Sequence, residues 1–287
     1  MNAVKEKAPA KINLFLDVVA KRADGFHDIR TVMHSVSLCD EITARVGRGK
    51  GGSVRLTLLG NRRLPTDSKN LAALAAERFL HSAGISDNVE ITLNKRIPVA
   101  AGLAGGSSDA AAVLRALNRL YKRPFTDRRL LALAAELGSD VPYCLVGGTA
   151  LCEGRGELIT RLPSPKSFFA VIATAHERVS TPAAYAELDE LFPSFDGANT
   201  AELEQLLTAI REGTELSGFY NIFEAAVLPA CPGAAALRSR LIELGASRSL
   251  MSGSGPSVYG IFDTEEAADR SAESLTAEGY TAFATRG

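Results

Sequence analysis

Hydrophobic and polar residues alternate along several stretches of the chain, and each alternation predicts a β-strand. In APAKINLFLDV, the hydrophobic positions Ile12, Leu14, Leu16 and Val18 occupy one face of an extended chain. Other stretches carry hydrophobic residues at helical spacing. Up to about residue 161, we expect strands over 9–19, 30–46, 53–59, 88–96 and 143–153, and helices near 69–83, 107–120 and 126–137. This order indicates mixed α and β structure with short connections.

A stretch rich in proline and serine, LPSPKS at 162–167, interrupts the pattern and predicts a domain boundary. We therefore expect an N-terminal domain over 1–163 and a C-terminal domain over 164–287. The second half should contain strands at 168–175, 247–252, 257–262 and 280–286, and helices at 182–191, 200–211, 219–228, 234–244 and 264–278. Reduced to its essentials, this order resembles a split β-α-β-β-α-β arrangement.

Composition supports two ordinary globular domains. A chain of 287 residues exceeds the size at which single hydrophobic cores stop growing. Hydrophobic residues make up 46%, charged residues 23%, and the formal net charge is -1. This near-neutral charge provides no general attraction to nucleic acid or to an anionic membrane, so we expect neither as a partner. No obligate protein partner is evident, and an anionic ligand would need a local site.

The cysteines and histidines give little sign of a metal or disulfide framework. The four cysteines are scattered without a C-x-x-C pair, and the start MNAVKEKAPAK lacks the apolar segment of a signal peptide. We therefore expect a reduced, cytoplasmic protein. The four histidines lack metal-ligand spacing, so a structural zinc site is not expected.

A glycine-rich loop, PVAAGLAGGSSDAAA at 98–112, lies between the predicted strand 88–96 and the predicted helix 107–120. Backbone N–H groups at a helix start bind anions well, and glycines let a ligand approach them. Ser107, Ser108 or Asp109 could cap the helix. The loop matches neither the Walker A pattern nor G-x-G-x-x-G, so a phosphate site here requires another nucleotide fold. The alternative is a tight strand-to-helix turn without a ligand.

Three other stretches carry candidate chemistry. Lys11 and Asn13 point to the same side of the first strand, either into a cleft or toward solvent. Asp140 follows a helix whose C-cap is Gly138, and it is either a turn residue or, close to Lys11, a base for a substrate hydroxyl. Near the C-terminus, SGSGPS joins two predicted strands as a hairpin turn and could offer a second set of exposed amides.

The order of three motifs, PAKINL, P-x-x-AGL-AGGSSDAA and SGSGPS, resembles the GHMP kinase superfamily, which phosphorylates small molecules. The resemblance extends from Ala8 to Phe262. RADGFH and LGSDVPY look like the branch whose substrate carries a cytidine diphosphate, and which acts in the non-mevalonate route to isoprenoid precursors. The resemblance implies an α+β, two-domain GHMP kinase fold, with an N-terminal domain like ribosomal protein S5 domain 2 and a ferredoxin-like C-terminal domain.

The resemblance also implies a reaction and its residues. ATP would phosphorylate the 2-hydroxyl of the methylerythritol part of the substrate, with Mg²⁺ assisting. Lys11 and Asp140 match the catalytic pair, with Asp140 as the base. ATP would contact Pro98, Ala101, Gly102, Leu103, Ala104, Gly105, Gly106, Ser107, Ser108, Asn70 and Lys95, while the substrate would contact Asn13, Phe26, His27, Asp140, Thr181, Tyr185, Gly253 and Ser254.

The sequence departs from the family at one point. Relatives commonly have tyrosine before the histidine of the RADG element and phenylalanine in the second half, whereas this chain has Phe26 and Tyr185. Base stacking survives both exchanges, but a hydrogen bond from a hydroxyl at position 26 does not. Two alternatives remain: another GHMP kinase, of homoserine or mevalonate type, which RADGFH argues against, and a catalytically silent regulator, which the retention of Lys11 and Asp140 argues against.

Overall fold

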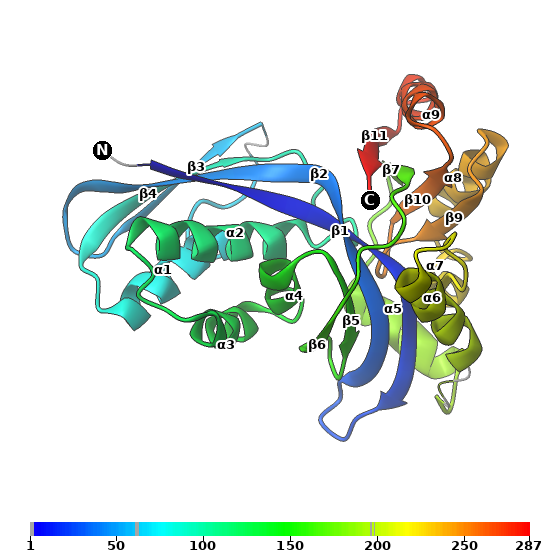
Figure 1. Cartoon of the computed structure of the whole chain (residues 1–287), viewed down its shortest axis with the longest axis horizontal. Helices are drawn as coiled ribbons and strands as arrows, with labels where there is room; N and C mark the ends of the chain where they lie inside the picture. The colour runs from blue at the N-terminus through cyan, green and yellow to red at the C-terminus, as the bar shows by residue number, and fades with distance from the viewer. Residues whose placement is uncertain (1–2, 61–62, 196, 198) are drawn as a thin grey trace. The chain divides into compact units, whose positions relative to one another are not determined.

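The computed structural model describes residues 3–60, 63–195, 197 and 199–287 (Figure 1). The chain forms two compact units that interleave along the sequence. Unit 1 contains Met1–Ala10, Cys39–Val99 and Ala104–Gly147, and unit 2 contains Lys11–Leu38, Ala100–Leu103 and Gly148–Gly287. The division into sequence domains at residue 163 stays a prediction.

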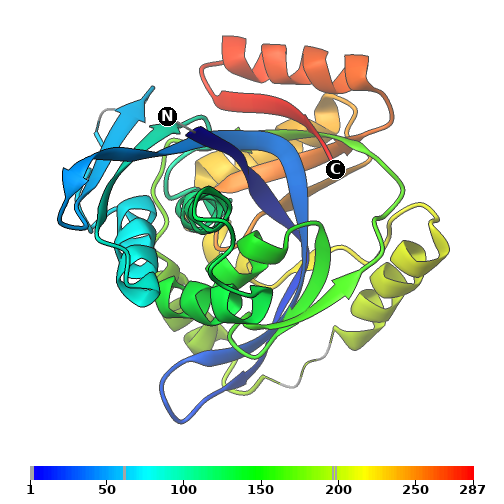
Figure 2. The ribbon, with the colours of Figure 1, turned by 60° about the vertical axis from the view of Figure 1, so that its left-hand side comes forward.

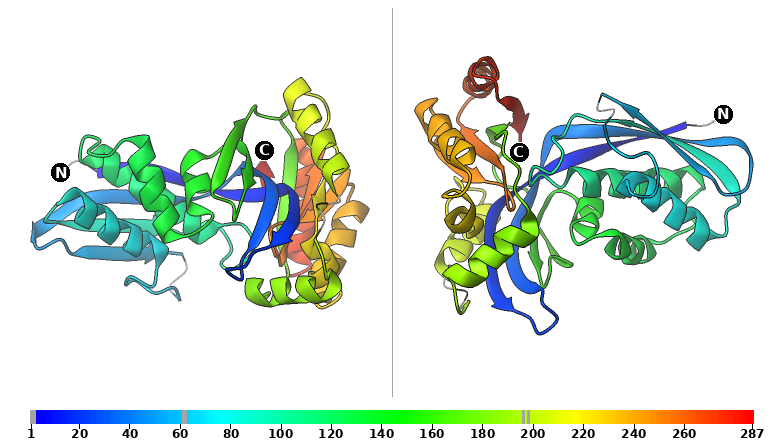
Figure 3. Two further views of the ribbon diagram at one scale, coloured as in Figure 1. Left: turned by 90° about the horizontal axis from the view of Figure 1, so that it is seen from below. Right: turned by 180° about the vertical axis from the view of Figure 1, so that it is seen from behind.

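Unit 1 is a sheet with helices on one face, as Figures 1 and 3 show. Its sheet combines the first part of β1 (Ala3–Lys21) and the second part of β2 (His27–Lys50) with β3 (Val54–Leu59) and β4 (Asp87–Asn94). Strand β4 pairs antiparallel with β2 and parallel with β3. The helices are α1 (Leu71–Ala83), α2 (Gly105–Leu120), α3 (Asp127–Leu137) and α4 (Val141–Val146).

Local sequence explains where these helices begin and end. Asn70 caps α1 by accepting a hydrogen bond from the Ala72 N–H, and Gly84 ends that helix in the left-handed conformation. The hydroxyl of Thr126 caps α3 in the same way. Helix α2 buries a long run of alanine and leucine residues, which packs against α1. The small alanine side chains allow this close helix contact.

Unit 2 contains a four-stranded antiparallel sheet in the order β11-β7-β10-β9. Its strands are β7 (Phe169–Thr174), β9 (Arg248–Met251), β10 (Ser257–Phe262) and β11 (Thr281–Arg286). Helices α8 (Pro232–Glu243) and α9 (Glu265–Ala277) pack on this sheet and share its buried core (Figure 2). This order confirms the split β-α-β-β-α-β arrangement.

The rest of unit 2 surrounds the remaining parts of β1 and β2. Strand β5 (Thr149–Glu153) pairs with β2 and with β6 (Leu158–Leu162), and the short β8 (Tyr220–Asn221) pairs parallel with β1. Helices α5 (Thr181–Leu191), α6 (Thr200–Glu212) and α7 (Phe223–Val227) complete the unit. Among the helices of the described ranges, none is long and apolar enough to cross a membrane.

Most predicted elements are confirmed, and the main error lies between residues 143 and 153. The sequence pattern predicts one strand there, whereas 141–146 form α4 and only Thr149–Glu153 form a strand. A short apolar run does not distinguish a buried strand from a buried helix. Pro142 favours the helix because its fixed φ suits a first turn, and Gly147 and Gly148, both at positive φ, separate the two elements. The predicted helix 219–228 is likewise divided into β8 and α7.

Candidate active site

Lys11 carries a buried positive charge in the middle of β1, with only 4% of its surface exposed. Its Nζ donates to Asn13 Oδ1 at 2.6 Å and to the Gly102 carbonyl at 2.9 Å. Asn13 is buried too, and its amide donates to Thr31 Oγ1 at 2.8 Å. Lys11 and Asn13 therefore share one side of β1, as predicted, and that side does not face solvent.

The turn between β9 and β10 is bound to this lysine cluster. The backbone N–H of Gly253 donates to Asn13 Oδ1 at 2.9 Å, and Ser252 Oγ donates to the Gly102 carbonyl at 3.0 Å. From β8, Asn221 Nδ2 donates to the Gly253 carbonyl at 2.9 Å. The hairpin predicted at SGSGPS is confirmed, and the first glycine loop and the late one meet at Lys11.

Close contact between the two loops requires glycine on each side. A Cβ on Gly102 would lie 2.1 Å from the Ser252 carbonyl oxygen, and Gly102 has a φ of +75°. A Cβ on Gly253 would lie 3.1 Å from the Gly102 carbonyl oxygen and 3.2 Å from Lys11 Nζ. A side chain at Gly102 would overlap the main chain of Ser252, and one at Gly253 would be tight and strained at a φ of +57°, so both glycines favour main-chain approach as well as a turn.

Two predicted substrate residues lie beside the same turn. The hydroxyls of Thr181, at the start of α5, and Ser254 are 2.8 Å apart. Lys11, Asn13, Gly102, Thr181, Gly253 and Ser254 thus form one linked group within unit 2.

The loop before α2 repeatedly adopts the left-handed conformation. Ala100 has a φ of 53°, Gly102 of 75° and Ala104 of 53°. Alanine rarely adopts this conformation, which costs about 1–2 kcal/mol per residue. Alternation between left-handed and ordinary backbone turns N–H groups toward one side and forms an anion-binding concavity. Of the other predicted contacts here, Ala101 and Leu103 are buried and Pro98 is partly buried.

Helix α2 begins earlier than its serines suggest. It starts at Gly105 with Ala104 as N-cap, and no side chain of the described residues makes the cap hydrogen bond. The prediction that Ser107, Ser108 or Asp109 caps the helix is therefore wrong, because all three lie inside it. The first N–H groups of a helix lack intrahelical acceptors. No side chain of the described residues therefore satisfies the first N–H groups of α2 as a cap.

Beneath this helix start lies a buried group of three charges. Lys95 Nζ donates to Asp109 Oδ2 at 2.8 Å and also to Asp40 Oδ2, and each of the three side chains is at most 4% exposed. Asp40 also accepts from the Ile97 N–H at 2.8 Å. In contrast, Asp109 Oδ1 has no hydrogen-bond partner in the described part of the chain. Burial, which outweighs the attraction of Lys95, raises the pKa of Asp109 to about 8.

Asn70 and Lys95, which are predicted to contact ATP, both make hydrogen bonds or ion pairs within unit 1. Asn70 caps α1 and donates through Nδ2 to the Pro65 carbonyl at 3.0 Å. The ammonium of Lys95 is bound by two carboxylates. A Cβ on Gly105 would lie 3.0 Å from Lys95 Nζ, so the lysine packs directly under the first residue of α2. The Lys95 N–H donates to the Leu59 carbonyl at 3.1 Å, so a main-chain contact of Lys95 with a nucleotide would use its carbonyl.

Asp140 is the residue immediately before α4, and it is partly buried. Its carbonyl accepts from the Cys144 N–H at 3.0 Å, which closes the first turn. Its side chain makes no cap hydrogen bond with the described residues. The carboxylate is thus not used to cap α4. Asp140 belongs to unit 1 and Lys11 to unit 2, so their pairing stays a prediction.

Phe26, His27 and Tyr185 are predicted to contact the substrate, and two of them, His27 and Tyr185, are stacked on each other. The rings of His27 and Tyr185 lie 4.6 Å apart and nearly parallel, at 18°. His27 Nε2 is 2.7 Å from Asp189 Oδ1, and Lys21 together with His27 holds the pKa of Asp189 below its ordinary value. Phe26 is 55% exposed, and its ring lies 5.0 Å from the guanidinium carbon of Arg155. Phe26 is therefore presented at the surface.

Comparison with known proteins identifies the family. Residues 70–148 match the GHMP kinases N terminal domain, and residues 198–281 match the GHMP kinases C terminal domain. The 4-diphosphocytidyl-2-C-methyl-D-erythritol kinase of Gloeobacter violaceus is 43% identical over 91% of this chain and 86% of its own. The chain belongs to this family of GHMP kinases. The same enzyme of Syntrophomonas wolfei is 42% identical over 93% of this chain and 92% of its own.

A solved structure supports the assignment at the level of the fold. The crystal structure of a 4-(cytidine 5'-diphospho)-2C-methyl-D-erythritol kinase matches with a TM-score of 0.81 and 36% identity, covering 99% of each chain. The predicted α+β GHMP kinase fold is therefore confirmed. Membership in the GHMP kinases also makes ATP the expected co-substrate.

Several residues of the candidate site were missed by sequence reasoning. Asp40, Thr31, Ser252 and Asn221 hold the predicted residues in place through the hydrogen bonds described above. None lies in a recognisable pattern of its own except Ser252, which begins SGSGPS. The best signal in the sequence was Asp40, a charged residue that directly follows a hydrophobic strand segment. Its complete burial is visible only in the fold.

The contact between the two glycine loops predicts a steric effect. Gly102→Ala should lower the free energy of unfolding by about 2–4 kcal/mol, because the new Cβ meets main chain at positive φ. Gly106→Ala is the control, since its Cβ first meets Leu71 at 3.7 Å, and it should change stability by less than about 1 kcal/mol. Urea unfolding measures both, and equal values would contradict close loop contact.

The buried charges predict a pH effect on stability. Folded Asp109 keeps a proton that the unfolded chain loses near the ordinary pKa of 3.8, so stability should fall as pH rises from about 4 to 8. Asp109→Asn removes this loss and should be more stable than the wild type near pH 8 by at least about 1 kcal/mol. Urea unfolding at several pH values tests this, with the exposed Asp263→Asn as control. Parallel curves for Asp109→Asn and the wild type would exclude a protonated Asp109.

Proposed function

We propose that this protein transfers the γ-phosphoryl group of ATP to the 2-hydroxyl of 4-diphosphocytidyl-2-C-methyl-D-erythritol, in the non-mevalonate route to isoprenoid precursors. The observation that carries the proposal is the 43% identity to a kinase of that name over 91% of the chain. The buried Lys11, held where two glycine loops meet, supports it. The cytoplasmic location expected from the cysteine pattern is part of the same proposal.

The chemical step needs a base and a nearby positive charge. In our proposal, the oxygen of the substrate hydroxyl attacks the γ-phosphorus while Asp140 accepts the proton of that hydroxyl, and ADP leaves. Lys11 stabilises the aspartate and the phosphoryl oxygens. Hydrogen bonds to Asn13 and to Gly102 fix the ammonium before any ligand binds. Phosphoryl transfer depends mainly on such positioning and charge neutralisation.

ATP phosphates would bind the loop from Pro98 to Ala104 and the first turn of α2, from Gly105 to Ser108. The left-handed residues of the loop and the uncapped helix start support this role. A protonated Asp109 supports it too, because a neutral carboxyl does not repel phosphate. Asn70 and the main chain of Lys95 would complete the nucleotide side.

Magnesium is expected to arrive with the nucleotide. Among the described residues, no group of three or more histidine, cysteine or acidic side chains is placed to hold a metal ion. Mg²⁺ in nucleotide sites keeps water and phosphate oxygens and needs few protein ligands. Ser108 fits this need, because its buried hydroxyl lacks a hydrogen-bond partner in the described chain. When bound there, the ion would neutralise phosphate charge.

The cytosine base would bind near Phe26, His27 and Tyr185. A flat, neutral base offers two faces for stacking and a polar edge for hydrogen bonds. The exposed ring of Phe26 is available to stack on the cytosine without any rearrangement. The ring of Tyr185 is held in place by stacking on His27. Thr181, Gly253 and Ser254, grouped with Asn13, would contact the rest of the substrate.

The catalytic pair predicts a large loss of turnover. Asp140→Asn should lower kcat by about 10²–10⁴-fold while ATP still binds, because a positioned base contributes this much. Lys11→Ala should cost a comparable factor, and the double variant should lose far less than the product of the two. Asp263→Asn, at an exposed position outside every proposed site, is the control and should keep full activity.

A coupled ADP assay measures these rates, with the diphosphocytidyl substrate, mevalonate, homoserine and galactose offered in parallel. A tenfold or smaller loss in Asp140→Asn would return Asp140 to the role of a turn residue. Preference for another member of the panel would overturn the substrate assignment but leave the kinase in place. No ADP release with any substrate would favour a silent nucleotide-binding regulator.

The base pocket predicts a selective loss of substrate affinity. Phe26→Ala and Tyr185→Ala should each raise KM for the cytidyl substrate by about one to two decades, since stacking is worth roughly 1–3 kcal/mol. The KM for ATP should stay nearly constant. Tyr185→Phe should be mild because its ring is retained. Removing His27 should reduce discrimination between cytosine and uracil analogues.

Leu158→Ala is the matched control for Phe26→Ala, because Leu158 is also exposed, at 60%, and has no proposed ligand. Steady-state kinetics with each substrate varied in turn gives both KM values. An unchanged cytidyl KM in folded Phe26→Ala and Tyr185→Ala proteins would contradict the cytosine pocket.

A further inference from the structure

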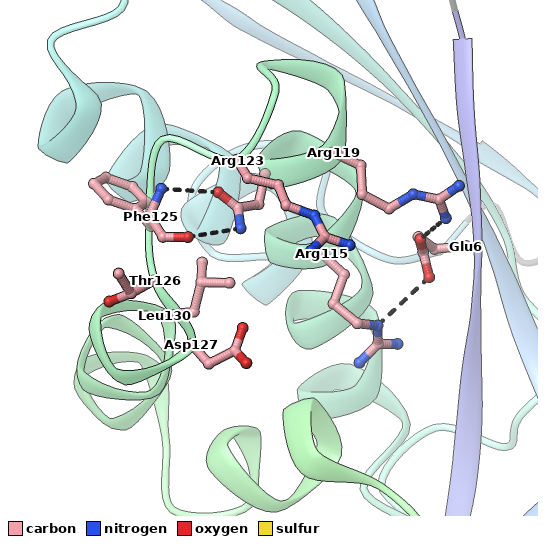
Figure 4. Close-up of a pocket in the computed structure, with 9 residues that line it drawn as sticks. Glu6, Arg115, Arg119, Arg123, Phe125, Thr126, Asp127 and Leu130 are labelled. Carbon is pink, nitrogen blue, oxygen red and sulfur yellow. Dashed lines mark hydrogen bonds and ion pairs between the residues drawn. The ribbon is translucent and has the colours of Figure 1, made fainter.

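A pocket lined by three arginines lies at the other end of α2 from the glycine loop, entirely within unit 1 (Figure 4). It has a volume of about 490 Å³, which suits a small metabolite. Helix geometry places Arg119 about 21 Å along α2 from Gly105, so this pocket is separate from the proposed ATP phosphate site. The lining residues are Glu6, Arg115, Asn118, Arg119, Arg123, Phe125, Thr126, Asp127 and Leu130.

The pocket lies in a basic segment of a chain that is nearly neutral. The segment 115–129 contains six lysine or arginine residues and one acidic residue, whereas the whole chain has a net charge of -1. Three guanidinium groups and two carboxylates line the cavity. Guanidinium groups bind phosphate through paired N–H donors, which makes arginine the usual residue at such sites.

The three arginines differ in how far they are already engaged. Arg115 donates to the carbonyls of Lys7 and Cys144, both at 2.9 Å, so it forms a wall of the pocket. Glu6 forms ion pairs with Arg115 and with Arg119 and balances one of these charges. Arg123 has no ion pair with any residue in the described ranges, although it borders the cavity. Arg123 therefore remains to bind an anion, whereas Arg119 would exchange its ion pair with Glu6 for one with the ligand.

The turn that carries Arg123 is rigidly held. Lys122 and Arg123 have φ values of 59° and 62°, which residues other than glycine rarely adopt. Asn118 holds the turn: its carbonyl accepts from the Arg123 N–H at 2.6 Å, and its amide exchanges two hydrogen bonds with the main chain of Phe125. The Phe125 ring packs edge-on against Phe79 at 5.0 Å. Strain maintained in this way is typical of a ligand site.

We propose that this pocket is a second anion site, which binds a small phosphorylated metabolite through Arg119 and Arg123. The Phe125 ring and the Leu130 side chain would contact an apolar part of that ligand. The volume of about 490 Å³ fits such a ligand as a whole, so a small phosphorylated metabolite is the occupant that we propose.

Inorganic pyrophosphate is the probe. We would titrate it into the ¹⁵N-labelled full-length protein at constant ionic strength, and follow the amide signals of Phe125 and Thr126 for the new pocket. The amides of Gly105 and Gly106 report the proposed ATP phosphate site in the same experiment. We expect saturable shifts at Phe125 and Thr126. Shifts confined to Gly105 and Gly106, or shifts that sulfate reproduces equally, would overturn the proposal.

Arg123→Asn removes the charge, and asparagine tolerates the left-handed backbone better than most residues. It should weaken pyrophosphate binding at Phe125 by about tenfold or more, since a hydrogen bond to a charged group is lost. Arg119→Gln should have a similar effect. Arg128→Gln is the matched control, because it removes the same charge from the same segment outside the lining.

Equal affinity at Phe125 in the wild type, Arg123→Asn and Arg128→Gln would overturn the site. Neither Arg119 nor Arg123 belongs to the proposed catalytic group, so kinase turnover without pyrophosphate should be unchanged in these variants. Loss of kinase activity in every preparation would count against the proposed function, whereas the Phe125 titration would still test the pocket.

Discussion

The buried ammonium group of Lys11 is the interaction on which the rest of the site depends. A buried charge is costly unless hydrogen bonds compensate for it. Here the acceptors are Asn13 Oδ1 and the Gly102 carbonyl, and each also accepts a hydrogen bond from the turn between β9 and β10. One positive charge therefore joins a strand, the first glycine loop and a second glycine turn. Glycine at 102 and 253 is the steric condition for this arrangement.

Helix α2 links the other main features. Every residue other than glycine that has a positive φ in the described chain lies at one of its ends: Ala100 and Ala104 before it, Lys122 and Arg123 after it. The first pair belongs to the proposed phosphate loop and the second to the basic pocket. The strained backbone thus coincides with the two places where we propose that an anion binds, and such strain often clusters at ligand sites.

Three buried charged groups, Lys95, Asp40 and Asp109, lie beneath the start of α2. Two buried carboxylates share the single ammonium of Lys95, and Asp40 also accepts backbone N–H groups. The second of these two carboxyl groups, Asp109, keeps its proton because burial raises its pKa. The group is then close to neutral. An ionised Asp109 would instead place a negative charge within the first two turns of the helix, where phosphate is proposed to bind.

The sequence by itself determined the features that depend on neighbouring residues. Alternation predicted that Lys11 and Asn13 share a side of β1, and glycine with serine predicted the loop before α2 and the β9–β10 hairpin, because strand period and turn chemistry are local. Together these motifs identified the superfamily. The tertiary structure alone decided which distant groups meet: Asn13 with Gly253, Lys95 with Asp40, and Asn221 with the late turn. It also decided that 141–146 form a helix. These outcomes depend on topology and burial, which bring together residues far apart in the chain and are not encoded in any short stretch.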